Sequence, residues 1–179
     1  MKKPILTFLG RDSGFGRENN SVYVEIDDKL AIIDCGFTVF EKLKEKLKLE
    51  EYKEIDVIIT HLHNDHAGSL SQLILYLYFI YNKKVNIISK CEKMKEYLEI
   101  TGTPEEAYTL QEEKEYVEII KTEHTKYLDA YGCKLTIKGK TIIYTGDTNT
   151  LEPYKPYIKS ADELYVDVSK FRRSAFKNR

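Results

Sequence analysis

The chain has 179 residues, enough for one domain with a hydrophobic core, and we expect residues 1–179 to form a single domain. Its composition, 42% hydrophobic and 32% charged, is typical of soluble globular proteins and excludes disordered, collagen-like and low-complexity classes. The 28 Lys and Arg residues nearly balance 29 Asp and Glu residues, so the formal net charge is −1. Because binding along a polyphosphate backbone needs a strong basic excess, we expect no long nucleic acid as a partner.

The sequence also argues against export and membrane insertion. The apolar stretch after Lys2 and Lys3 is shorter than the roughly 7–15 residues of a secretory signal. The longest apolar run, residues 73–81, is about half of a membrane span. The three cysteines are widely spaced and contain no CxxC pair, so reduced thiols are expected. We therefore expect a cytoplasmic protein with no membrane partner.

Short β-branched runs predict strands, and longer stretches with apolar residues at helical spacing predict helices. In chain order, strands are expected at 5–9, 21–26 and 30–34, a helix around 40–47, a strand at 56–60, a helix at 69–82, a strand at 85–89, a helix around 91–98, and strands at 116–121, 133–138, 141–145 and 164–168. This order fits sheets flanked by helices, of the α/β or α+β class.

Three of the four histidines fall in one segment, Thr60-His61-Leu62-His63-Asn64-Asp65-His66. The i, i+2 spacing at a strand end puts His61 and His63 on the same side, where both imidazoles can reach one metal ion. Asp65 and His66 lie on the following turn and suit a second ion. A surface histidine cluster is the alternative, but the position directly after an apolar strand disfavours it.

Two further residues are weaker candidates. His124 follows an apolar strand, and although a lone histidine is more often structural, a three-imidazole site needs one more ring. Asp147 follows the 141–145 strand and Gly146, so its carboxylate can project from a strand end. An aspartate after glycine is more often a turn former.

With these residues in view, the chain resembles a known family. HLHNDHAG matches the HxHxDH signature of the metallo-β-lactamase fold hydrolases, and TEHTKYLDAYGCKLTIKGKTIIYTGDT and AIIDCG are similar to other motifs of that family. The resemblance covers residues 5–168 and implies an α+β, four-layer αββα sandwich with its site between the sheets. It implies that His61, His63 and His124 bind one metal, that Asp65 and His66 bind a second, and that Asp147 bridges both. Asp34 matches a buried aspartate that orients the signature histidines, with a simple turn residue as the alternative.

One family feature is missing from the sequence. Full dinuclear members use a further histidine after the last strand, and this chain has none beyond His124. A missing C-terminal segment, an incomplete second site and replacement by another group, such as Asp167, are three open explanations. The basic ending KFRRSAFKNR shows no clear amphipathic period, so we expect a C-terminally shortened sandwich whose second metal position is empty or partly occupied, with low activity.

The resemblance implies metal-assisted hydrolysis, with up to two Zn²⁺ per chain and with Mn²⁺ or Fe²⁺ as alternatives. Asp65 is the expected catalytic residue, because its carboxylate can hold the proton of the nucleophile. The IIYTGDT segment and the hairpin before it are most similar to the phosphodiesterase branch. The first hypothesis is therefore a phosphodiesterase that cleaves a small phosphodiester or cyclic nucleotide through a metal-activated hydroxide.

Two other functions stay open at this point. One is an acyl hydrolase of thioesterase, lactonase or β-lactamase type, and the other is a truncated member with little or no turnover. The expected partner is a small-molecule substrate, and the sequence leaves a homodimer open.

Overall fold

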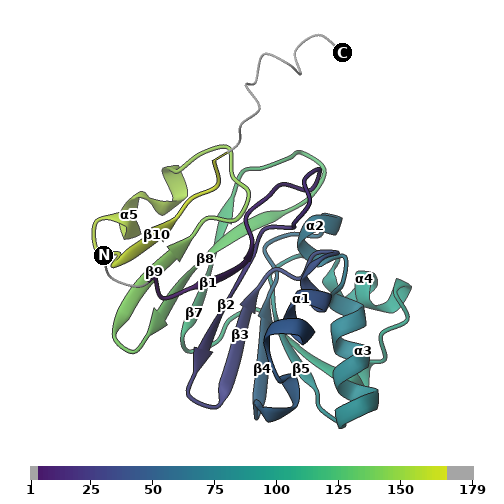
Figure 1. Cartoon of the computed structure of the whole chain (residues 1–179). Helices are drawn as coiled ribbons and strands as arrows, with labels where there is room; N and C mark the ends of the chain where they lie inside the picture. Colours follow the sequence, from purple (N-terminus) through teal and green to yellow (C-terminus); the bar gives the residue numbers. More distant parts are fainter. Residues whose placement is uncertain (1–3, 169–179) are drawn as a thin grey trace.

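Two β-sheets lie face to face at the centre of the molecule, with helices on their outer sides (Figure 1). The structure, a computed structural model, describes residues 4–168. The first sheet has the order β1-β2-β3-β4-β5-β6 and the second the order β10-β9-β8-β7. This is the α+β, four-layer αββα arrangement that the sequence predicts. Within residues 4–168, the outer layer of the second sheet consists of one 3₁₀ turn and one short helix.

The elements have the following bounds. The first sheet contains β1 (Thr7–Gly10), β2 (Ser21–Ile26), β3 (Lys29–Ile33), β4 (Glu54–Ile58), β5 (Val85–Ile88) and β6 (Tyr108–Gln111), and the second contains β7 (Val117–Thr122), β8 (Ala130–Ile137), β9 (Lys140–Tyr144) and β10 (Glu163–Tyr165). The helices are α1 (Val39–Lys46), α2 (Asn64–Ala67), α3 (Leu70–Tyr81), α4 (Met94–Ile100) and α5 (Lys155–Ile158), with 3₁₀ turns η1 (Leu49–Glu51), η2 (Glu105–Ala107) and η3 (Glu152–Tyr154).

The core explains why these segments adopt these elements. Strands β3, β4 and β5 are parallel neighbours, and their near-continuous apolar runs are buried, as in sheets covered on both faces. Helix α3 buries Leu70, Leu73, Ile74 and Leu77, which recur at the spacing of one helix face. Each such side chain contributes about 1.5–3 kcal/mol when fully buried. On the far side, the fully buried Tyr154 of η3 packs against the second sheet.

The structure corrects several expected boundaries. Strand β6 is not among the expected elements, because its four residues carry little apolar pattern and their extended form depends on parallel pairing with β5. The strand expected at 56–60 ends at Ile58, and the last strand covers only Glu163–Tyr165. The turn expected at Asp65 and His66 is the single-turn helix α2. The basic ending, 170–179, lies outside the described residues.

The topology brings polar residues together at one end of the sandwich. Parallel strands end at the same sheet edge, so the segments after β3 and β4 are neighbours there, and the segments after β7 and β9 reach it from the second sheet. The three cysteines are free and buried. No helix among the described residues has the length and apolar character needed to cross a bilayer.

Candidate metal centre

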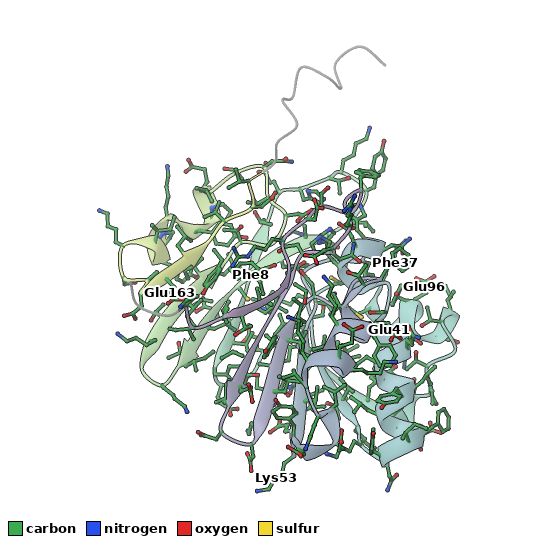
Figure 2. All side chains as sticks on the ribbon, viewed as in Figure 1. Phe8, Phe37, Glu41, Lys53, Glu96 and Glu163 are labelled. Carbon is green, nitrogen blue, oxygen red and sulfur yellow. The ribbon has the colours of Figure 1, made fainter. Side chains whose placement is uncertain are left out.

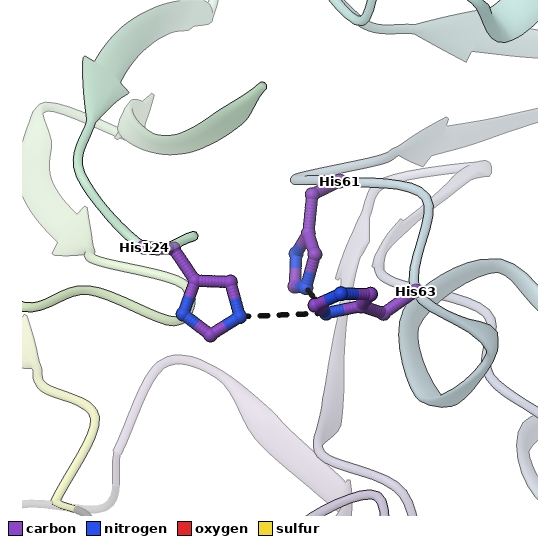
Figure 3. Close-up of side chains that lie close together, drawn as sticks. All are labelled: His61, His63 and His124. Carbon is purple, nitrogen blue, oxygen red and sulfur yellow. Dashed lines mark hydrogen bonds between the residues drawn. The ribbon is translucent and has the colours of Figure 1, made fainter. Parts of the chain in front are cut away.

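Three imidazoles converge between the two sheets. His61 and His63 come from the segment after β4, and His124 comes from the segment after β7 (Figure 3). Nε2 of His61 lies 2.9 Å from Nδ1 of His63, which lies 3.4 Å from Nε2 of His124. Three imidazole nitrogens turned toward one point are the donor set of a tetrahedral zinc site with one open position.

A second group of donors lies beside the first. Nε2 of His66, on α2, is 3.3 Å from a carboxylate oxygen of Asp65 and 3.3 Å from Oδ1 of Asp147. The other oxygen of Asp147 is 3.6 Å from Nε2 of His124. Asp147 therefore stands between the two groups, with one oxygen toward each.

The structure thus brings all six predicted ligands into one cluster. Donor atoms of His61, His63 and His124 lie within 4.8 Å of one another, as do those of His61, His66 and Asp147. Among the described residues, Asp65 and Asp167 belong to neither of these two sets; Asp65 joins the cluster through its 3.3 Å contact with His66, whereas the backbone N–H of Asp167 donates to Oγ1 of Thr145. The roles of the six residues as ligands stay predictions, as does the incomplete second metal position.

A buried carboxylate behind the histidines orients two of them. Asp34, which is fully buried, accepts hydrogen bonds from N–H and Oγ1–H of Thr60 and from Nδ1 of His66 at 2.8–2.9 Å. Since the Thr60 hydroxyl donates to Asp34, it accepts from Nδ1–H of His61 at 3.1 Å. This hydrogen-bond pattern places a ring proton on Nδ1 in His61 and His66, so that Nε2 is the nitrogen that carries the lone pair toward the cluster when the ring is neutral.

The electrostatics of the cluster suit a cation. Burial lowers the pKa of His61 to about 2 and also lowers that of His63, which keeps both rings neutral and able to donate a lone pair. Burial opposes ionisation of Asp147, but hydrogen bonding and charge from His66 lower its pKa to about 2. Burial likewise opposes ionisation of Asp65, but the hydrogen bond and charge of His66 lower its pKa. Neutral imidazoles and ionised carboxylates are the protonation states that metal ligands need.

His66 titrates in the opposite direction from the other two rings of its segment. Burial disfavours its charged form, but Asp34, Asp147 and Asp65 surround it and raise its pKa well above the ordinary value. Three carboxylates around one imidazole leave negative charge in excess at this position. A bound cation at Nε2 would balance that charge, so the residues present fit a metal ion.

The cluster is open to solvent on one side. The side chains of Asp65, His124 and Asp147 are 20–24% exposed, whereas His61 and His66 are buried. A groove of about 570 Å³ adjoins His124 and runs between residues 92–93, 121–130 and Asn149. Its volume falls within the range of small-molecule sites.

Two contributions to the site have no counterpart in the sequence-based assignment. Thr60 links Asp34 to His61, and its place directly before the histidine motif is the only sequence signal for that role. Gly14 and Gly36 pack directly on Asp65: a Cβ on Gly36 would lie 1.9 Å from its carbonyl oxygen, and one on Gly14 would lie 2.7 Å from its Cγ. These glycines let two loops approach the site.

The sequence comparison identifies the family. The family model described as "Anti-Pycsar protein Apyc1" matches residues 5–98, from before β1 through α4, including the histidine segment. The chain belongs to the Apyc1 family.

Curated relatives agree with this membership. The chain is 35% identical to the Apyc1 protein of Paenibacillus harenae over 44% of this chain and 33% of that protein. It is 27% identical to the Apyc1 protein of Bacillus phage 010DV004 over 80% of this chain and 68% of that protein. The chain therefore spans about a third of the length of the Paenibacillus relative.

Solved structures show the fold. The metallo-β-lactamase fold protein YhfI from Bacillus subtilis superposes with a TM-score of 0.75 at 20% identity, covering 89% of this chain and 68% of YhfI. The short form of human tRNase Z gives a TM-score of 0.68 at 18% identity, covering 89% of this chain and 75% of that enzyme. A diphosphatase of the PhnP family gives a TM-score of 0.58 at 20% identity, covering 84% of this chain and 60% of the diphosphatase. The chain has the metallo-β-lactamase fold.

Proposed function

We propose that the protein is a metal-dependent phosphodiesterase that cleaves a small phosphodiester, with a cyclic nucleotide as the first candidate. The observation that carries the proposal is the position of Asp147, whose two oxygens lie 3.3 Å from His66 and 3.6 Å from His124. One carboxylate shared by two donor groups is the arrangement that holds two neighbouring cations. Such a pair, when bound, supplies Lewis-acid activation of water and of a phosphoryl oxygen.

The chain's own residues divide the remaining work. His61, His63 and His124 would hold one ion, Asp65 and His66 the other, and Asp147 both, with Zn²⁺ as the first candidate metal. Asp34 and Thr60 keep the ring protons of His61 and His66 on the far nitrogens. Asp65 lies on the open side of the cluster with its carboxylate 20% exposed, where an oxygen of that carboxylate can accept the proton of an attacking water.

The surroundings of the site support a small substrate. The groove beside His124 has a volume of about 570 Å³, and acidic residues accompany its lysines, so it offers no extended basic track. The net charge of −1 points the same way. Two of the fold neighbours are named as a tRNase and a diphosphatase, which supports a phosphate-containing substrate.

A substrate panel on metal-loaded protein tests the proposal. We expect hydrolysis of bis-p-nitrophenyl phosphate and of 3′,5′-cyclic nucleotides, and little or no turnover of nitrocefin or an acyl thioester. Metal content is measured by elemental analysis on the same sample. Rapid nitrocefin or thioester cleavage without phosphodiesterase activity would overturn the proposal in favour of an acyl hydrolase. No turnover of any substrate with metal bound would favour a binding role.

A further inference from the structure

Exposed aromatic side chains concentrate around the metal centre. Among the described residues, four aromatic side chains are exposed: Phe15 at 96%, Phe37 at 60%, Phe79 at 69% and Tyr127 at 79%. Phe79 lies on α3, but the other three lie on loops that also contact or carry the site. Phe15 follows Gly14, which packs on Asp65, Phe37 packs on Gly68 at the end of α2, and Tyr127 is three residues after His124. Three separate loops that contact or carry the site therefore each present an exposed aromatic ring, of which Phe37 is labelled in Figure 2.

Phe15 is the most exposed of these rings and lies on a loop that is held in shape. The carboxylate of Asp12 accepts hydrogen bonds from the backbone N–H groups of Ser13 and Arg17, at 3.0 Å each. The N–H of Gly16 donates to the carbonyl of Ser13 at 2.8 Å, which closes the turn around Phe15. The loop is anchored and still turns an apolar ring into water.

The placement of Phe15 relative to the chemistry is close. Gly14, the preceding residue, is in direct contact with the carboxylate of Asp65, because a Cβ there would lie 2.7 Å from its Oδ2. Phe15 therefore directly follows a residue that contacts the predicted metal ligand Asp65, and 96% of Phe15 is exposed. A flat molecule whose phosphate reaches the cluster would bring its ring system to this loop.

We propose that Phe15 stacks on the nucleobase of a nucleotide whose phosphodiester lies at the metal centre. The proposal rests on the proposed function and adds the base as a recognised part of the substrate. Stacking on an aromatic side chain tolerates any base, because every base has a π-face. Phe15 is then a substrate-binding residue that contacts the base while the phosphodiester lies at the metal centre.

The absence of tryptophan from the chain allows a direct test. In metal-loaded Phe15→Trp protein, the single indole reports on contact with a base. We expect saturable quenching by adenosine 3′,5′-cyclic monophosphate and no saturable change with ribose 3,5-cyclic phosphate, which has the diester without the base. Phe79→Trp is the matched control, since Phe79 is also exposed but lies on α3, and its emission should not respond. Equal quenching by both compounds would overturn the proposal. A change in emission that follows protein concentration alone would also overturn it, because it would assign Phe15 to contact with a second copy of the chain.

Kinetics separate this proposal from the proposed function. Phe15→Ala should raise KM for the cyclic nucleotide about 5- to 100-fold with little change in kcat, and leave KM for the base-free diester unchanged. Phe15→Tyr should restore the wild-type KM. Hydrolysis by wild-type protein with no effect of Phe15→Ala and no quenching would overturn the stacking alone. Failure of wild-type protein to cleave either diester, with base-dependent quenching intact, would overturn the phosphodiesterase function alone.

Discussion

Replacement of Asp34 by alanine removes one buried acceptor that serves three donors. Thr60 loses partners for its N–H and its hydroxyl, and His66 loses the partner of Nδ1, all in an environment without solvent. Breaking a buried charge pair of this kind typically costs about 3–5 kcal/mol. Asp34 also has a φ of 65°, a left-handed conformation that costs alanine a further ~1–2 kcal/mol. Burial disfavours the charged form of Asp34 and raises its pKa. The alanine variant no longer carries this cost of burying a carboxylate, which offsets part of the destabilisation. We therefore expect a decrease of about 3–5 kcal/mol in the free energy of unfolding.

Metal binding should respond to the same change. Without Asp34, Nδ1–H of His66 loses its acceptor at 2.8 Å and keeps only the longer contact with the Thr60 hydroxyl at 3.5 Å, so the lone pair at Nε2 is no longer assured. Loss of such a supporting partner typically weakens metal affinity about 10- to 100-fold. The assays are urea unfolding of metal-free protein and competition with a chelator.

Two further variants make the Asp34 experiment decisive. Asparagine tolerates the left-handed backbone and still accepts from Thr60, so Asp34→Asn should recover part of the stability but little of the metal affinity. Asp28→Ala is the surface control: its pair with Lys53 is exposed to solvent, and its removal should leave the urea midpoint and the metal affinity close to those of the wild-type protein. Wild-type metal affinity in folded Asp34→Asn and Asp34→Ala proteins would refute the proposed orientation of His66.

The remaining predictions concern catalysis, pH and packing. Asp65→Ala should keep the fold and lower kcat at least about 10²-fold, measured with bis-p-nitrophenyl phosphate, and a wild-type rate would exclude the proton-accepting role. Burial lowers the pKa of His61 to about 2, so this ring stays neutral in the metal-free folded protein under conditions where the unfolded chain protonates it. The free energy of unfolding should therefore fall below pH ~6.5 by up to ~1.4 kcal/mol per pH unit. Equal urea midpoints at about pH 6.5 and 5 would contradict this. Gly36→Ala would place a Cβ 1.9 Å from the carbonyl oxygen of Asp65 and should lower the free energy of unfolding by about 1–3 kcal/mol in urea. Gly139→Ala is the control for the loss of glycine flexibility, because its Cβ meets no atom within 4 Å. The φ of Gly139 is 75°, so this control also includes backbone strain.

Local sequence pattern determined much of the architecture. The β-branched runs and the helical spacing of the apolar residues in α3 predict the central elements, because alternation and 3.6-residue periodicity reflect which face each residue buries. Strand β6 escaped prediction because a four-residue edge strand takes its extended form from the backbone of β5 rather than from its own pattern. The last strand is shorter than predicted, since only three of its residues pair with β9.

For the candidate site too, local sequence predicted one part and tertiary contacts decided the other. The proximity of His61, His63, Asp65 and His66 was predictable from the sequence alone because residues so close along the chain cannot lie far apart in space. His124 and Asp147 were candidates only by residue type and by resemblance, since no local rule relates residues separated by about sixty to eighty positions.

Tertiary structure decided how these parts meet. The packing of the second sheet on the first brings the ends of β7 and β9 to the end of β4, which places His124 and Asp147 beside the histidine segment. The Asp34–Thr60–His61 chain of hydrogen bonds and the approach of Gly14 to Asp65 arise from the same packing. Hydrogen bonds and steric contacts act over only a few ångströms, so they exist only once the sheets have assembled, whereas the periodicity that selects strands and helices is already present in the unfolded chain.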